Sequence, residues 1–258
     1  MELKLTDLVP LPSKGKLYPP NHPFHNKEEV EIRYLTAADE DILTTKSLLK
    51  NGEIFNRIIS EVVLDKSLNP NSLLVGDRDA ILIYTRILSL GSEYKASGTC
   101  KYCDSSDKYT FDISNVPMKY LELVPEVENE NRFKFTTSFD NKIEFQFPTI
   151  ELVKKIQKTM ELKEKALKKA MVFNGIDSTA TTTYKELILS INGETDRAKI
   201  GEFIDKNMPL KEIRELSKFY SENQPKIEFV SDFYCKNCGQ TNEEVLLDFN
   251  PTFFWTEF

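Results

Sequence analysis

The four cysteines are the residues of this chain whose types and spacing best suit chemistry. They form two pairs of the form Cys-x-x-Cys, at residues 100–103 and 235–238. Such a turn points two sulfurs at one place, and two turns supply the four thiolates of a tetrahedral zinc site. We predict one structural zinc ion, because four thiolates leave no position open for substrate. The predicted ligands are Cys100, Cys103, Cys235 and Cys238.

Redox pairs and disulfides are the alternative roles for these cysteines. A redox Cys-x-x-Cys motif requires a βαβ setting, which neither pair has. Two disulfides require an oxidising compartment, and the N-terminus does not resemble a secretion signal. We therefore expect reduced cysteines and a cytoplasmic place of synthesis.

Segments rich in β-forming residues precede and follow each pair and must position it. They cover residues 93–99 and 108–113 around the first pair, and 226–234 and 244–249 around the second. This pattern predicts two β-hairpins that bind one metal ion. The result would be a zinc ribbon whose halves are separated by residues 104–234.

The rest of the pattern predicts an α+β fold that is mostly helical, with the zinc ribbon formed by two separated β-hairpins and a further small β-hairpin. Alternating aromatic residues on either side of Asp140 and Asn141 predict that further hairpin. Helical spacing of apolar residues predicts helices over residues 36–49, 53–64, 77–90, 149–173, 179–191, 196–206 and 209–221. The expected segments are an extended proline-rich arm (1–26), a strand with a helical unit (27–92), the first ribbon hairpin (93–116), a connector with a hairpin (117–148), a helical insertion (149–222) and the second ribbon hairpin with an aromatic tail (223–258).

Composition argues against several classes of function. The 258 residues include 34 Lys and Arg against 41 Asp and Glu, a net charge of −7, so nucleic acid is an unlikely partner. Neither a glycine-rich phosphate loop nor an HExxH motif is present. No apolar run approaches the roughly 20 residues that cross a bilayer. The chain has two histidines, both in the arm, and the sequence shows no pair of residues that could act as nucleophile and general base. We therefore predict that the protein is not an enzyme.

Both ends of the chain carry apolar residues that need a surface to pack on. The arm holds Leu17 and Tyr18 among dense prolines, and the tail ends in Phe253, Phe254 and Trp255. Exposed aromatic residues are costly in water, and they are common at protein interfaces. We interpret these five residues as candidate partner contacts, with docking on the chain itself as the alternative. Arg86, among apolar neighbours, is interpreted as a structural arginine, either ion-paired or snorkelling.

The order of several motifs resembles the baseplate proteins of T-even-type bacteriophages, described as baseplate hub subunits or hub assembly proteins. The motifs lie at residues 11–19 (Leu-Pro-Ser-Lys-Gly-Lys-Leu-Tyr-Pro), 30–36, 76–78 (Gly-Asp-Arg), 86–94 (Arg-Ile-Leu-Ser-Leu-Gly-Ser-Glu-Tyr), 235–239 (Cys-Lys-Asn-Cys-Gly) and 253–255 (Phe-Phe-Trp). The resemblance implies a structural or assembly role in the hub of a contractile tail, with other baseplate or hub proteins as partners. It implies assembly in the host cytoplasm, and the protein would then either stay in the virion tail baseplate or act only during assembly. The oligomeric state stays open.

The alternative is a nucleic-acid-binding zinc-ribbon protein of the transcription type. Such ribbons carry basic and aromatic residues near the metal, and here Lys101, Tyr102 and Lys236 are of that kind. Binding to phosphates would be steeply salt-dependent, so a gel-shift at low and moderate salt separates the two hypotheses.

Overall fold

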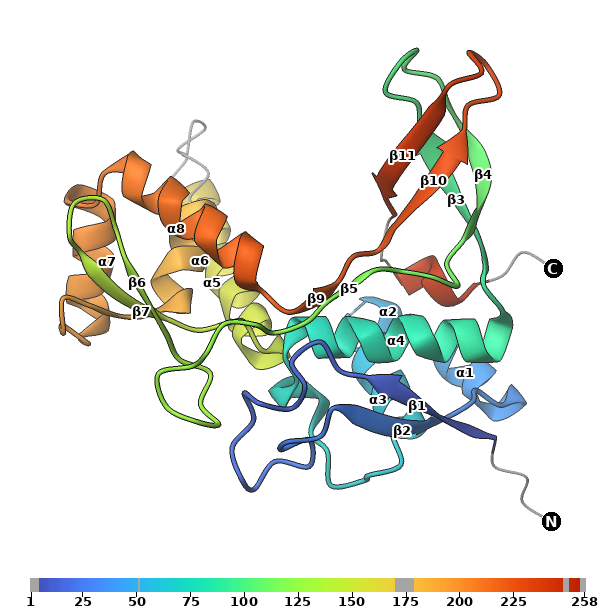
Figure 1. Ribbon diagram of the computed structural model, residues 1–258, viewed down its shortest axis with the longest axis horizontal. Helices are drawn as coiled ribbons and strands as arrows, with labels where there is room; N and C mark the ends of the chain where they lie inside the picture. Colours follow the sequence, from blue (N-terminus) through green and yellow to red (C-terminus); the bar gives the residue numbers. More distant parts are fainter. Residues whose placement is uncertain (1–4, 51, 170–178, 248–250, 256–258) are drawn as a thin grey trace.

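Helix α4 (Val75–Leu90) crosses the middle of the protein, and the other elements are arranged around it (Figure 1). The computed structural model describes residues 5–50, 52–169, 179–247 and 251–255. Strands β1 and β2 and helix α3 contact α4. Strands β6 and β7 with helices α5–α8 lie at one end of the molecule, and two β-hairpins project at the other.

The helices and strands have the following bounds. Besides α4, the α-helices of the described residues are α1 (Glu40–Leu43), α2 (Lys46–Lys50), α3 (Ile54–Val62), α5 (Ile150–Lys169), α6 (Thr179–Leu187), α7 (Arg197–Lys206) and α8 (Leu210–Asn223). The strands are β1 (Thr6–Pro10), β2 (Glu29–Arg33), β3 (Glu93–Thr99), β4 (Ser106–Asp112), β5 (Met118–Lys119), β6 (Phe133–Thr136), β7 (Lys142–Phe145), β8 (Ile188–Ile191), β9 (Lys226–Ile227), β10 (Val230–Tyr234) and β11 (Thr241–Leu246). Short 3-10 helices are η1 (Ala37–Asp39), η2 (Pro70–Ser72) and η3 (Pro251–Phe254).

The prediction of a mostly helical chain was wrong. Helices make up 38% and strands 24%, and the strands form several small antiparallel sheets. Four of the sheets are two-stranded, pairing β1 with β2, β3 with β4, β5 with β9 and β10 with β11, and the fifth has the order β6-β7-β8. The two ribbon hairpins and the further hairpin are present, but short strand pairs between distant segments were not visible in the sequence pattern.

Strand β8 is the clearest local correction. The helix predicted over residues 179–191 ends at Leu187, and residues 188–191 (Ile-Leu-Ser-Ile) continue as a strand that pairs with β7. Periodicity cannot distinguish a short apolar run in a helix from one in a buried strand. The segment 149–222 is therefore not all helical, and it shares a sheet with the hairpin before it. The end predicted for the preceding helix, at residue 173, lies outside the described residues.

The proline-rich arm is fixed to α4 by a buried carboxylate. Asp77, in the first turn of α4, accepts hydrogen bonds from the Ser13 backbone N–H (2.9 Å), the Ser13 hydroxyl (2.5 Å) and the Tyr18 hydroxyl (2.6 Å). All three residues are at most 2% exposed. Strand β1 holds the start of the arm, and Pro10 is tolerated there because β1 is an edge strand of a two-stranded sheet. The arm thus folds back on its own chain.

Gly76 lies where α4 closely approaches the chain that returns from α8. A Cβ atom there would lie 2.2 Å from the Pro225 carbonyl oxygen and 3.0 Å from the Lys226 Cα. We expect Gly76→Ala to lower the free energy of unfolding by about 2 kcal/mol or more, because backbone must move to admit the methyl group. Urea unfolding measures the change.

Gly201 provides the matched control within helix α7. A Cβ atom there would meet only the flexible Lys185 side chain, at 3.9 Å. Gly201→Ala is therefore expected to stabilise the protein by about 1 kcal/mol through helix propensity. Similar effects at both positions would show that the contact between α4 and Pro225 does not constrain the fold.

Candidate metal centre

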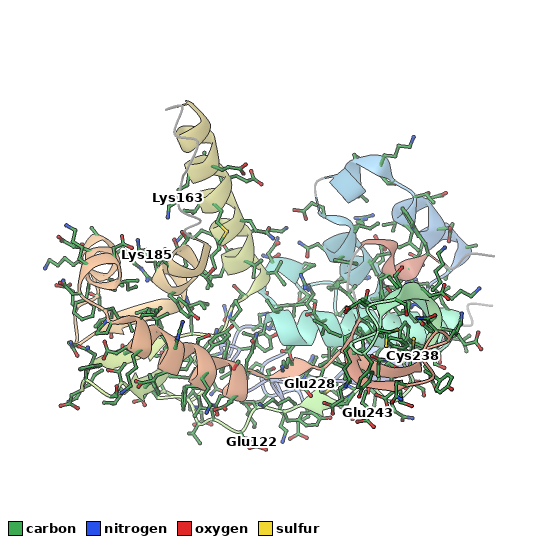
Figure 2. The ribbon with its side chains drawn as sticks, turned by 90° about the horizontal axis from the view of Figure 1, so that it is seen from above. Glu122, Lys163, Lys185, Glu228, Cys238 and Glu243 are labelled. Atoms are coloured by element: carbon green, nitrogen blue, oxygen red, sulfur yellow. The ribbon has the colours of Figure 1, made fainter. Side chains whose placement is uncertain are left out.

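The four cysteines meet at the tip of the two projecting hairpins. Their Sγ atoms all lie within 4.8 Å of one another, with 3.6 Å between Cys100 and Cys238 and 3.7 Å between Cys103 and Cys235. Sulfurs bound tetrahedrally at about 2.3 Å from one zinc ion would be about 3.8 Å apart. The spacing therefore fits a single tetrahedral metal ion. Figure 2 labels Cys238 at one end of the molecule, with Lys163 and Lys185 toward the other.

Both cysteine turns are built by the same backbone hydrogen bonds. The N–H of Cys100 donates to the Ser105 carbonyl, and the N–H of Cys235 donates to the Gln240 carbonyl, both at 2.9 Å. The N–H four residues after each of these cysteines donates back to its carbonyl, again at 2.9 Å. The donors, Asp104 (φ 56°) and Gly239 (φ 73°), have left-handed backbone, which tight turns require. Equivalent local structure thus forms at two places far apart in sequence.

Aromatic packing below the turns joins the two hairpins. The rings of Tyr109 in β4 and Phe233 in β10 have centroids 4.2 Å apart, and Phe111 meets Phe233 edge-on at 5.9 Å. Gly98 lets them approach, because a Cβ atom there would lie 3.0 Å from Tyr109 and 3.1 Å from Phe233. The sulfurs are therefore held by a small hydrophobic core as well as by the turns.

Polar groups around the sulfurs favour the thiolate forms of Cys103 and Cys235. The Ser105 hydroxyl lies 3.1 Å from Cys103 Sγ and 3.4 Å from Cys235 Sγ. Hydrogen bonds from Ser105 and from the backbone of Cys238 lower the pKa of Cys235 to about 5. Although the Gln240 backbone lowers the pKa of Cys238, burial and the neighbouring thiols raise it to about 12. Four thiolates this close repel one another, so a cation that shares their charge would stabilise the cluster.

Asn242 connects the second hairpin to the first cysteine turn. Its side chain is fully buried, its Nδ2 donates to Cys100 Sγ (3.4 Å), and its Oδ1 accepts from the Lys101 N–H (2.9 Å). Sequence reasoning missed this residue, because an asparagine four residues after Cys238 carries no ligand spacing. Only the strand alternation of β11, which turns it inward, could have drawn attention to it.

We expect Asn242→Ala to weaken metal binding by about 10- to 100-fold, the usual effect of removing a residue that orients a ligand. A competition titration with a chromogenic chelator measures the affinity. Asn237→Ala is the matched control, since Asn237 is exposed and its Nδ2 reaches Cys103 Sγ only at 3.5 Å. Equal losses in the two variants would contradict a special role for Asn242.

The five residues interpreted as candidate partner contacts are not part of this cluster. Leu17, Tyr18, Phe253 and Phe254 are at most 3% exposed and pack within the chain, whereas Trp255 is 45% exposed. Of these five residues, Trp255 is the one with a solvent-exposed side chain, and their role as partner contacts stays a prediction. The remaining aromatic tail residues, 249 and 258, lie outside the described residues.

The two histidines make hydrogen bonds within the arm and from the arm to Ser72, and they are absent from the cysteine cluster. His22 Nε2 lies 2.8 Å from the Ser72 hydroxyl, and its Nδ1 accepts from the Phe24 N–H at 3.0 Å. Burial lowers the pKa of His22 to about 4, so its ring is neutral at pH 7. His25 Nδ1 lies 2.8 Å from the Tyr18 carbonyl oxygen.

The fold and the cluster define a protein built around a central helix, with a double hairpin whose cysteines could hold a metal ion. A family model described as T4 bacteriophage base plate protein matches residues 7–255, and the chain belongs to that family. Comparisons with curated proteins and with solved structures gave no match. Among the described residues, none of the helices has the length and apolar character to cross a membrane. Family membership makes the protein a phage baseplate component with other phage proteins as partners.

Proposed function

We propose that this baseplate protein acts in the central hub, as a structural or assembly component without enzymatic activity, and that its cysteine cluster binds one structural zinc ion. The observation that carries the proposal is the meeting of four sulfurs from two distant segments in a chain of the baseplate family. Assembly would take place in the host cytoplasm, with the virion tail baseplate as the final location. The hub assignment rests on the motif order in the sequence.

Zinc is the ion that the donor set favours. Four thiolates in a tetrahedral arrangement suit zinc, whereas magnesium and calcium prefer oxygen ligands. All four coordination positions would be occupied by Cys100, Cys103, Cys235 and Cys238. The ion would therefore hold structure and would not activate water or substrate.

The metal would act as a clasp between the tips of the two hairpins. It would join β3 and β4 to β10 and β11, on either side of the helical part of the chain. A second junction, the pairing of β5 with β9, lies closer to α4. The clasp would thus fix the direction of the double hairpin, while β5, β9 and α4 hold the two ends of the molecule together.

Two measurements test this proposal. Elemental analysis of the purified protein should give one zinc per chain, and the protein should co-purify with hub components from infected cells. A chain that carries zinc but remains alone during assembly would contradict the hub role and leave the clasp intact. A gel-shift at low salt tests the nucleic-acid alternative, for which we expect no binding.

A further inference from the structure

The turn between β6 and β7 lies at the end of the molecule opposite the double hairpin (Figure 1). Its backbone is closed by two hydrogen bonds of 3.0 Å, from the Thr137 N–H to the Asn141 carbonyl and from the Asp140 N–H to the Thr137 carbonyl. Asp140 has left-handed backbone, with φ 66°. These contacts leave Ser138 and Phe139 at the tip.

A buried carboxylate on α8 fixes this turn from below. Glu212 is fully buried and accepts hydrogen bonds from the Thr137 hydroxyl and from Asn141 Nδ2, the latter at 2.9 and 3.0 Å to its two oxygens. The neighbouring Glu215 accepts from the Ser138 N–H at 3.0 Å. A buried carboxylate is costly unless its hydrogen bonds are satisfied, and here they serve to immobilise the turn.

The residue that this rigid turn presents is an exposed phenylalanine. Phe139 is 60% exposed, and Leu210, the first residue of α8, is 64% exposed. Lys211 Nζ lies 5.7 Å from the centroid of the Phe139 ring, and the lysine side chain is 67% exposed, with Glu215 as a 3.7 Å ion-pair partner. Single exposed apolar residues are ordinary, but an exposed aromatic ring on an immobilised turn loses little entropy on binding.

We propose that Phe139, with Lys211 beside it and the exposed Leu210 preceding Lys211 in the chain, is the anchor of a protein–protein interface. Its partner would be another baseplate protein that offers an apolar pocket bordered by a carboxylate. The ring would fill the pocket, and Lys211 would pair with the carboxylate at its edge, an arrangement that supplies both affinity and orientation. The choice of a baseplate protein as partner rests on the proposed function.

Binding of the purified chain to each of the phage's other baseplate proteins, presented singly by biolayer interferometry, tests the inference. Phe139→Ser should weaken binding to one of them by at least about 30-fold, the effect of losing a central interface residue. Leu162→Ser is the matched control, because Leu162 on α5 is equally exposed, at 58%. It should leave the affinity unchanged.

The charge of the surface is tested separately. Lys211→Glu should weaken the same complex by about 10-fold or more, through repulsion by the partner's carboxylate. Lys218→Glu is the control, since Lys218 is on the same helix and 76% exposed. Thermal unfolding midpoints should be unchanged in all four variants, because each replaced side chain is mostly in solvent.

Three results would overturn the proposed Phe139 interface. Binding that Phe139→Ser leaves within twofold of wild type overturns this interface and leaves the baseplate role intact. Failure of the wild-type chain to bind any baseplate protein overturns both. A dimer that sedimentation detects in the wild type and not in Phe139→Ser would identify a second copy of this chain as the partner and overturn the inference of a carboxylate-bordered pocket.

Discussion

Replacing Cys235 with serine is expected to release the metal and open the double hairpin. Cys235 is fully buried, and its sulfur lies 3.7 Å from that of Cys103. Structural zinc can contribute on the order of 10 kcal/mol in small domains, so loss of one ligand removes a large share of the stability of the two hairpins. Zinc content should fall well below one per chain.

Hydrogen exchange locates the effect within the chain. Amides of β3, β4, β10 and β11 should lose protection in Cys235→Ser, whereas those of α5 and α8 should keep it, because the β5–β9 pair and α4 still join the two parts. Tyr102→Ser is the matched control, since Tyr102 lies in a cysteine turn, is 57% exposed and offers no thiolate. It should retain zinc and full protection.

Removing zinc from the wild-type protein with a chelator is a second way to reach the metal-free form expected for Cys235→Ser. A strong chelator, or a fall in pH that protonates the thiolates, should reproduce the exchange pattern of Cys235→Ser, and added zinc should reverse it. Unchanged protection in the hairpins after complete removal of zinc would contradict the clasp. In that case the aromatic contacts of Phe233 would be sufficient to hold the hairpins together.

Replacing Arg86 with leucine is expected to destabilise the protein by about 3 kcal/mol or more, because a buried carbonyl that loses its donor costs about 1–3 kcal/mol and several lose it at once. The side chain is 1% exposed and donates to three backbone carbonyls, those of Gly91 (2.7 Å), Glu93 (2.7 Å) and Phe253 (3.0 Å). Leucine would fill part of the volume but leave these carbonyls without their donor. Burial also lowers the pKa of Arg86, although the group remains charged.

The C-terminal segment should be released in this variant, because Arg86 is its polar anchor. Trp255 is the single tryptophan of the chain and follows η3, so its fluorescence anisotropy should fall when the segment detaches. Arg57→Leu is the control, since Arg57 is 54% exposed and makes an i,i+4 pair with Glu61 worth at most about 0.5 kcal/mol. Unchanged anisotropy in Arg86→Leu would show that aromatic packing alone fixes the tail.

Arg86 also illustrates how far sequence reasoning reached. Its apolar neighbours indicated a structural arginine that snorkels or forms an ion pair. The side chain is 1% exposed, so it does not snorkel, and within the described residues it donates to backbone carbonyls and forms no ion pair. These carbonyls belong to two segments, residues 91–93 and Phe253, and the second is 167 residues away. Carbonyls have no sequence signature, and only folding brings Phe253 to the end of α4.

The sequence by itself determined the cysteine turns, the hairpins beside them, the strand at β2 and most of the helices. These features depend on local spacing and on the periodicity of apolar residues, which a single segment carries within itself. The baseplate resemblance was likewise carried by ordered local motifs, and the family match bears it out. The predictions of a mostly helical fold and of an all-helical insertion were wrong, because the strands that they missed form only by pairing with distant segments.

Only the tertiary structure decided which segments meet. The four-residue strand β8 pairs with β7, and two-residue strands pair across more than a hundred positions at β5 and β9. The fixing of the arm by Asp77, the placement of Asn242 beside Cys100 and the support of the Phe139 turn by Glu212 are contacts of the same kind. Each joins residues far apart in sequence, so their energy depends on the closure of a long loop by the rest of the fold, which local pattern does not encode.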